Sequence, residues 1–143
     1  MSNDCVFCEI VDGSSPASVV WEDELVMAFL DLQPVRPGHT LLVPKVHAES
    51  MGEMEVSTGS HLFGVSMRIA EAIRLSLGAE GINLFVADGE AAGQEVPHFH
   101  LHVIPRTEGD GFGLTFPPTY PYRLARSELD KVAESITDVL AET

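Results

Sequence analysis

Long apolar runs, basic residues and cysteines are all scarce in this chain. No hydrophobic stretch approaches the roughly 20 residues that a membrane-spanning helix requires, so we expect no membrane segment. Only 8 of the 143 residues are basic, against 22 acidic residues. The formal net charge of −14 repels polyanions, which makes nucleic acids and anionic membranes poor partners. A small anionic ligand remains compatible with this charge, because local donors outweigh a distant surface field.

Signals for secretion and for several domains are missing as well. The segment Met1–Asp4 has neither the basic start nor the apolar block of a secretory signal, so we expect a cytoplasmic protein. The chain also contains no internal repeat and no low-complexity tract. We therefore expect a single domain over residues 1–143, in which 107–143 form an irregular segment rich in Gly and Pro, followed by a helix.

The apolar pattern predicts five strands and two helices. Strands are expected at residues 19–21, 25–30, 39–43, 82–87 and 98–104. The first helix should begin near Ser57, Thr58 or Ser60 and end at Gly78, and its apolar residues Leu62, Val65, Ile69, Ile73 and Leu77 recur at helical spacing. The last helix should begin at Ser127. This order predicts an α+β domain with a mainly antiparallel five-stranded sheet.

The only two cysteines, Cys5 and Cys8, form a C-x-x-C pair. Such a pair serves as metal ligands, as a redox couple, or not at all. A redox couple is expected to follow a strand, and no strand precedes this pair. Metal ligands are therefore the favoured interpretation, ahead of incidental thiols.

Three histidines, His98, His100 and His102, alternate along the last predicted strand. Side chains at every second position of a strand share one face, which leaves Phe99 and Leu101 for the core. Three imidazoles on one face indicate function, since strand faces usually carry β-branched or aromatic residues. They are compatible with a three-histidine zinc site or with a nucleophile and its supporting groups.

Polar and glycine residues just before the histidines favour the second chemistry. Gly89 and Gly93 let backbone N–H groups approach an anion, and the amides of Asn83 and Gln94 can donate to phosphate oxygens. A phosphate cradle beside an imidazole favours nucleotidyl transfer, although a glycine loop alone is a weak signal.

The segment Ala92–Arg106 resembles the signature of the histidine-triad (HIT) family, His-x-His-x-His followed by apolar residues. Cys5–Ile10 resembles the N-terminal segment of that family, and Phe29–Asp31 with Pro37–His47 resembles its central hairpin. The resemblance implies a HIT-like fold, a homodimer and a nucleotide-binding hydrolase or transferase.

The resemblance also implies roles for individual residues. His100 is the expected nucleophile, which forms a nucleotidyl-histidine intermediate, with His102 at the phosphate and His39 beside them. Asp31 is expected to bind the ribose hydroxyls, and Asn83 and Gln94 the phosphate or leaving group. The full nucleotide site implied by the resemblance is Phe7, Ile10, Phe29, Asp31, Leu32, Asn83, Gly93, Gln94, Glu95, Val96, His100 and His102.

By the same resemblance, Cys5, Cys8, His47 and His98 are expected to bind a structural Zn²⁺, as in some bacterial-type members of the family. Two sulfurs and two imidazoles suit tetrahedral zinc. No organic cofactor is expected. His98 would then serve structure rather than catalysis.

The expected substrate is a purine nucleotide derivative that yields AMP or GMP, either a phosphoramidate or a dinucleoside polyphosphate. One alternative is a non-enzymatic nucleotide-binding or adaptor protein on the same fold, and a three-histidine metal hydrolase is a third possibility. The chain departs from the phosphoramidase branch of the family at Glu95, where that branch has Ser or Thr. This departure leaves the substrate class open.

Overall fold

The computed structural model describes residues 4–143, so Met1, Ser2 and Asn3 of the N-terminal segment lie outside the described residues. The chain separates into one unit that ends at Phe112 and a second unit, Gly113–Thr143. Among the described residues, no helix is long and apolar enough to cross a membrane. The cytoplasmic location expected from the sequence stays a prediction.

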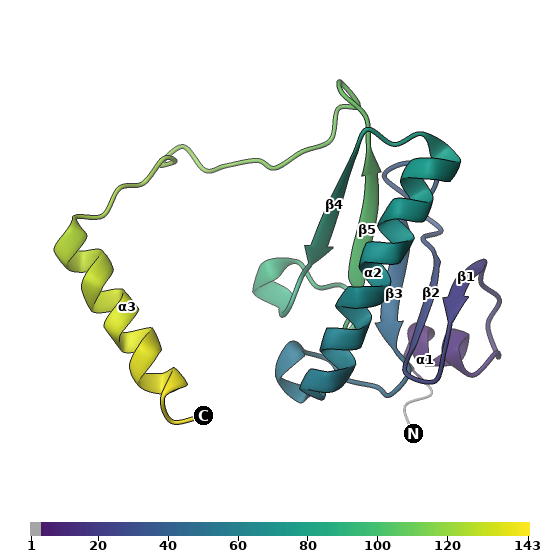
Figure 1. The fold of residues 1–143 in the computed structure, drawn as a ribbon, viewed down its shortest axis with the longest axis horizontal. Helices are drawn as coiled ribbons and strands as arrows, with labels where there is room; N and C mark the ends of the chain where they lie inside the picture. Colours follow the sequence, from purple (N-terminus) through teal and green to yellow (C-terminus); the bar gives the residue numbers. More distant parts are fainter. Residues whose placement is uncertain (1–3) are drawn as a thin grey trace. The chain divides into compact units, whose positions relative to one another are not determined.

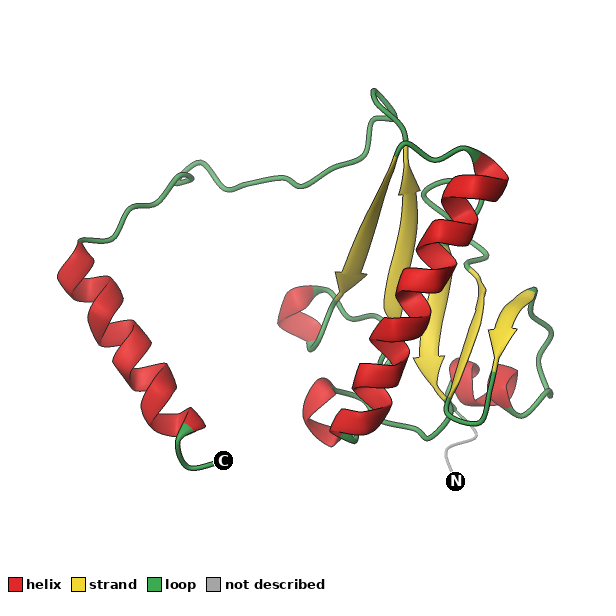
Figure 2. Ribbon diagram, in the orientation of Figure 1, coloured by secondary structure: helices red, strands yellow, loops and turns green. Residues whose placement is uncertain are grey.

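A five-stranded antiparallel sheet forms the first unit, as the sequence predicted (Figures 1 and 2). Its spatial order is β1-β2-β3-β5-β4, so the last strand lies between the third and the fourth. The strands are β1 (Val19–Glu22), β2 (Val26–Leu30), β3 (Thr40–Pro44), β4 (Gly81–Val86) and β5 (Leu101–Arg106). His102 on β5 is opposite Leu41 of β3 on one side and Phe85 of β4 on the other, which places it in the interior of the sheet.

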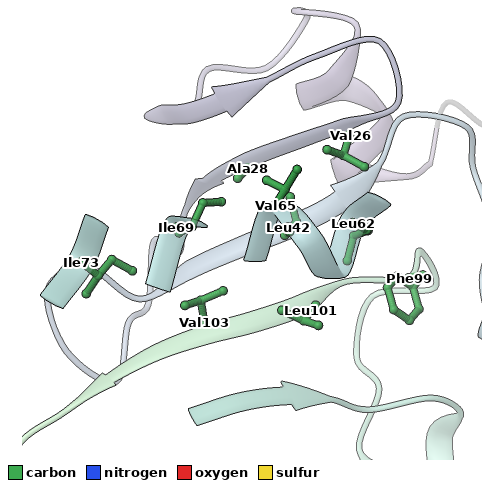
Figure 3. Packing of buried hydrophobic residues seen from close by; sticks show 10 residues of the cluster. All are labelled: Val26, Ala28, Leu42, Leu62, Val65, Ile69, Ile73, Phe99, Leu101 and Val103. Atoms are coloured by element: carbon green, nitrogen blue, oxygen red, sulfur yellow. The ribbon is translucent and has the colours of Figure 1, made fainter. Parts of the chain in front are cut away.

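The helix α2 (Val56–Leu77) covers one face of this sheet. Its predicted apolar face is confirmed in part, because Leu62, Val65, Ile69 and Ile73 are buried but Leu77 is 55% exposed. Figure 3 shows these side chains over alternate residues of the central strands. The cluster consists of Val26, Ala28, Leu42, Leu62, Val65, Ile69, Ile73, Phe99, Leu101 and Val103.

A second apolar cluster lies on the opposite face, where the histidines are. The sequence analysis missed the short helix α1 (Val6–Val11), which carries Phe7 into this cluster. Phe7 packs there with Cys5 and with the strand residues that alternate with those of the first cluster, Met27, Phe29, Leu41 and Val43. The strand alternation thus separates a helix-covered face from a face that carries polar chemistry.

Several predicted boundaries were wrong. The strand β5 begins at Leu101 rather than at His98, although Phe99, Leu101 and Val103 do share the helix-covered face. The helix α2 begins at Val56, ahead of the proposed serine and threonine caps, and ends as predicted at Gly78, whose φ of 68° is left-handed. In the second unit, the helix α3 (Arg126–Leu140) starts one residue before Ser127, and none of its residues is buried. Two short 3-10 helices, Met51–Glu53 and Glu90–Ala92, complete the described elements.

Candidate functional site

A cavity of about 540 Å³ opens on the face of the sheet that carries the histidines. His100 and His102 line it, together with Asp31. Four apolar residues of the expected nucleotide site also line it, namely Phe7, Ile10, Phe29 and Leu32. Gly93, Glu95 and Val96 supply part of the wall from the loop before β5. The structure therefore brings most of the predicted nucleotide site to one cavity.

The ring of His100 is held in one tautomer by the main chain. Its Nδ1 lies 2.7 Å from the carbonyl oxygen of His98. A carbonyl oxygen only accepts, so the proton is at Nδ1, and the lone pair is left at Nε2. His100 is 8% exposed, and the edge of Phe7 packs against its ring, with the centroids 5.0 Å apart. This arrangement leaves Nε2 as the unprotonated nitrogen of a buried imidazole that lines the cavity.

A hydrogen-bonded chain fixes the tautomer of His102 in the same way. The backbone N–H of Val35 donates to Nδ1 of His39 over 3.0 Å, so His39 carries its proton on Nε2. This Nε2 lies 2.9 Å from Nδ1 of His102 and donates to it. His102 therefore keeps its own proton on Nε2. The result is a neutral N–H donor beside His100.

Burial and neighbouring groups keep these rings neutral. Burial, together with the adjacent His100 and His39, lowers the pKa of His102 to about 4. Burial also lowers the pKa of His39, an effect that the Asp31 carboxylate opposes. The Asp31 Oδ2 is 3.6 Å from Nε2 of His39, and its Oδ1 accepts the backbone N–H of Gln33. At neutral pH, both His39 and His102 therefore act through single N–H groups rather than as cations.

Four possible metal-ligand atoms lie close together at His98, the first histidine of the triad. The Sγ of Cys5 is 3.3 Å from Nδ1 of His98, and the Sγ of Cys8 is 3.3 Å from Nδ1 of His47. The two Nδ1 atoms are 3.2 Å apart, and the Sγ of Cys8 lies 3.6 Å from His98 Nδ1. His98 is fully buried and donates from Nε2 to the carbonyl oxygen of Pro44 over 2.9 Å, which leaves Nδ1 unprotonated.

These separations fit a single tetrahedral metal ion. Bond lengths of about 2.3 Å to sulfur and about 2.0 Å to nitrogen place tetrahedral ligands roughly 3.3–3.8 Å apart. All four donor atoms lie within 4.8 Å of one another. Without a cation, burial and the neighbouring Cys5 raise the pKa of the Cys8 thiol to about 11. A divalent cation would displace this proton and bind Cys8 as the thiolate.

The three triad histidines do not converge on one point. His98 turns Nδ1 toward the cysteines, whereas Nδ1 of His100 is occupied by a carbonyl group. A second group of possible ligands, Asp31, His39 and His102, is joined instead by the 2.9 Å hydrogen bond between the two imidazoles. The described geometry does not favour the three-histidine metal site considered above.

Two residues expected at the phosphate lie elsewhere in this structure. The amide of Gln94 is engaged by backbone groups, since it accepts from the N–H of Gly89 and donates to the carbonyls of Glu49 and Val96. Asn83 does not line the cavity, and its Oδ1 accepts from Nη1 of Arg106. The phosphate contacts expected of these two residues are therefore not prepared in this structure, and they stay predictions.

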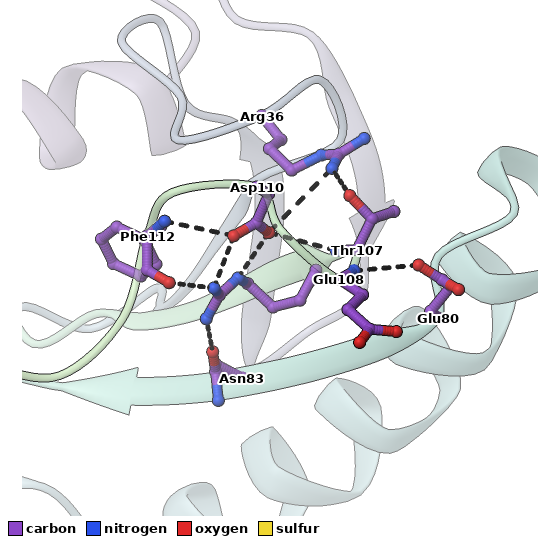
Figure 4. Close-up of polar contacts among 8 residues, drawn as sticks. Arg36, Glu80, Asn83, Thr107, Glu108, Asp110 and Phe112 are labelled. Atoms are coloured by element: carbon purple, nitrogen blue, oxygen red, sulfur yellow. Dashed lines mark hydrogen bonds and ion pairs between the residues drawn. The ribbon is translucent and has the colours of Figure 1, made fainter.

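Asn83 belongs to a polar cluster around Asp110 (Figure 4). The guanidinium of Arg106 donates to both carboxylate oxygens of Asp110, which holds the pKa of Asp110 far below its ordinary value. Arg36 approaches the same carboxylate at 4.0 Å and donates to the hydroxyl of Thr107. Because the carbonyl of Arg36 also accepts the N–H of His39, this cluster anchors the loop that carries His39 to the turn after β5.

Sequence reasoning missed three groups that shape the site. Phe85 lines the cavity and packs on His102 with the ring centroids 5.5 Å apart. The N–H of Val35 sets the tautomer of His39, and the carbonyl of Pro44 sets that of His98. Alternation along β4 places Phe85 on the same face as Asn83, but only the strand register places it opposite His102. Backbone groups such as those of Val35 and Pro44 leave no signal in side-chain identity.

The chain is similar to a known protein family and to several known proteins. The sequence profile of the HIT domain matches residues 12–109. The protein named Protein hit of Bacillus subtilis is 39% identical over 143 residues, which cover 99% of this chain and 98% of that protein. Adenylylsulfatase HINT3 of Arabidopsis thaliana is 39% identical over 77% of this chain and 56% of that longer protein.

Solved structures give the same result. A HIT family protein from Bacillus anthracis is 41% identical and has a TM-score of 0.89, with 97% of this chain and 99% of that chain covered. A zinc-bound histidine triad family protein from Mycobacterium smegmatis is 39% identical and has a TM-score of 0.74, with 92% and 97% covered. The HIT-like fold expected from the sequence is confirmed.

The lowered pKa of His102 makes a pH-dependent contribution to stability. The unfolded chain binds this proton near pH 6.5 and the folded chain only near pH 4, so the unfolded state binds more protons between these values. The free energy of unfolding should therefore fall as the pH decreases from about 6.5 to about 4. Urea unfolding at pH 7.0, 5.5 and 4.5 measures this slope. His102→Gln should reduce the loss by about 1–3 kcal/mol, and equal slopes in both proteins would contradict the assignment.

Proposed function

The chain belongs to the HIT family, and from this membership we propose that it is a nucleotidyl hydrolase or transferase whose nucleophile is His100. The observation that carries the proposal is the hydrogen bond from His100 Nδ1 to the His98 carbonyl, which leaves Nε2 unprotonated. The name of a relative, adenylylsulfatase, denotes hydrolysis of a nucleotide. These points support an enzyme that acts on activated nucleotides.

The lining of the cavity suits a purine nucleoside monophosphate moiety such as that of AMP or GMP. An apolar wall of Phe7, Ile10, Phe29 and Leu32 would accept the base. The carboxylate of Asp31, close by in the same cavity, would accept hydrogen bonds from the ribose hydroxyls. This placement would direct the 5′-phosphate toward His100 and His102.

In the first step, the lone pair of His100 Nε2 would attack phosphorus and form an N–P bond, while the bond from phosphorus to the leaving group breaks. The imidazole becomes cationic at this stage, and its Nδ1–H continues to donate to the His98 carbonyl. Water then attacks phosphorus and releases the nucleoside monophosphate and neutral His100. Two displacements thereby replace one more difficult displacement.

The neutral His102 would assist both displacements. Its Nε2–H would donate to a phosphoryl oxygen, because Nδ1 is already occupied by His39. A fixed donor of this kind stabilises the charge that the oxygens carry in the transition state without having to reorganise. His39 would act through His102 and would not touch the substrate.

Trapping the intermediate tests the nucleophile. Incubation with adenosine 5′-phosphoramidate, alkaline quenching and peptide mass spectrometry should find one adenylyl group on His100, because an N–P bond is stable to base and labile to acid. His100→Ala should abolish the adduct and lower kcat by about 10³-fold or more. His61→Ala is the matched control, since His61 is paired with Asp23 outside the cavity.

Full turnover by His100→Ala would refute the mechanism. Binding of AMP without any adduct or turnover of several activated nucleotides would instead favour a non-enzymatic nucleotide-binding protein.

We further propose that Cys5, Cys8, His47 and His98 bind Zn²⁺. The donor distances and the zinc-bound relative support this assignment. The ion would supply a structural cross-link between α1, the residues after β3 and the start of the triad. It would hold the ring of His98, whose carbonyl orients His100.

Metal analysis tests this site. The purified protein should contain about one zinc per chain, and Cys8→Ser should contain close to none. The same variant should unfold at a midpoint roughly 5–10 °C lower, since metal binding adds to the stability of the folded state. His61→Ala, which removes a histidine outside the cluster, should keep both properties. Zinc content unchanged by Cys8→Ser would refute the assignment.

We also propose that the protein is a homodimer. Large apolar side chains are exposed on α2, such as Phe63 at 50% and Met67 at 60%. The apolar residues of α3 are also exposed, among them Val132 at 52% and Ile136 at 55%. Burial of such side chains between two copies would stabilise a dimer.

Light scattering on the eluting peak of a size-exclusion column should give twice the chain mass of 15.5 kDa. The variant Phe63→Glu with Met67→Glu should shift the protein toward the monomer, since it would bury charge at the interface. A wild-type mass equal to that of a single chain at micromolar concentration would contradict the proposal.

A further inference from the structure

Glu95 is an unpaired carboxylate at the wall of the cavity. It belongs to the loop between the 3-10 helix Glu90–Ala92 and β5, and it is exposed to solvent. Within residues 4–143, its carboxylate has no hydrogen-bond or ion-pair partner. The other acidic residue in the wall, Asp31, is engaged by the N–H of Gln33 and lies near His39. With Asp31 assigned to the ribose, Glu95 is the carboxylate of the wall that no other group of residues 4–143 engages.

No permanent positive charge balances Glu95 in this wall. Among the described residues that line the cavity, none is Lys or Arg. His102, which lines it, is held neutral by its burial and its neighbours. Arg36 in the loop before β3 and Arg106 at the end of β5 are both directed to Asp110 in the cluster of Figure 4. With a formal net charge of −14 on the whole chain, the cavity presents a negative field to its ligand.

A negative field in the cavity favours substrates with cationic leaving groups over substrates with anionic leaving groups. Neutral donors would bind the phosphate that His100 attacks. Every substrate contains this phosphate, so its binding does not distinguish one substrate from another. A polyphosphate leaving group would add several negative charges to a wall that has no side-chain cation, whereas an amine with a second, distant ammonium group would add a positive charge. At several ångströms and a dielectric close to that of water, each unit charge changes the rate by about three- to tenfold.

We propose that Glu95 determines leaving-group specificity by charge, and that it favours nucleotidyl phosphoramidates whose amine carries a second cationic group over dinucleoside polyphosphates. This inference rests on the proposed function of His100. In the reaction, Nε2 of His100 forms a bond to phosphorus, and the electron pair of the scissile P–N bond goes to the leaving nitrogen. A water molecule supplies the proton to that nitrogen, and the hydroxide that it leaves attacks phosphorus in the second step, which breaks the bond between phosphorus and His100. Glu95 takes no part in bond making and acts only on the distant charge.

Three adenosine 5′-phosphoramidates of equal length test this charge selection. Their leaving amines are 1,4-diaminobutane, 4-aminobutanol and 4-aminobutyrate, which end in an ammonium, a hydroxyl and a carboxylate group. For the wild-type protein, kcat/KM should decrease in that order by about three- to tenfold at each step. The order should flatten in 0.5 M salt, since screening weakens an interaction between exposed charges. Diadenosine triphosphate should be turned over more slowly than any of the three.

Variants at position 95 separate this effect from the field of the whole chain. Glu95→Gln keeps the size of the side chain and should bring the three rates within about twofold, and Glu95→Lys should reverse their order. Glu90→Gln is the matched control, because Glu90 is an exposed acid of the same connection between β4 and β5 that does not line the cavity. This control should keep the wild-type order.

The outcomes that refute the two proposals differ. If the wild type turns over all three compounds at equal rates, or if Glu95→Gln keeps the wild-type order, Glu95 does not select the leaving group, and the function proposed for His100 stands. If none of the compounds is turned over and no adduct forms on His100, the proposed function is wrong, and the inference about Glu95 is wrong with it.

Discussion

The 2.7 Å hydrogen bond from His100 Nδ1 to the carbonyl of His98 is the contact on which the candidate site depends. It sets the tautomer of the proposed nucleophile through a group that can only accept. The ring of His98 fixes the position of this residue and therefore of its carbonyl. One ring nitrogen donates to Pro44, and the other faces Cys5 and Cys8. Disorder at the cysteine cluster would therefore alter the position of the His98 carbonyl and, with it, the orientation of the proposed nucleophile His100.

The site uses neutral donors in place of cations. A backbone N–H at Val35 begins a chain that passes through His39 and ends with an N–H of His102 in the cavity. Burial keeps the two rings uncharged, so that the direction of each hydrogen bond is fixed. The donor proposed to bind the phosphate is thereby prepared before a substrate binds. This arrangement suits a cavity wall in which, among the described residues, no lysine or arginine is present.

The arginines near the site serve a structural purpose. Asp110 takes two hydrogen bonds from Arg106 and attracts Arg36, so that the turn after β5 and the loop before β3 are tied together. Arg36 also accepts the N–H of His39 through its carbonyl group. The hydrogen-bond chain of the histidines is in this way supported by charged groups that lie outside the cavity. Asn83, expected at the phosphate, is drawn into this cluster by Arg106.

The sequence by itself determined the antiparallel sheet, the apolar face of α2 and the separation of Phe99, Leu101 and Val103 from the histidines. These properties follow from local periodicity, since alternate residues of a strand occupy opposite faces. Resemblance to a known family supplied the grouping of the two cysteines with His47 and His98. Tertiary structure alone decided which nitrogen of each histidine is free, where Gln94 and Asn83 direct their amides, and how Phe85 reaches His102. Such contacts join segments far apart in the chain, 93 residues in the case of Cys5 and His98, and depend on strand register and packing that no local pattern encodes.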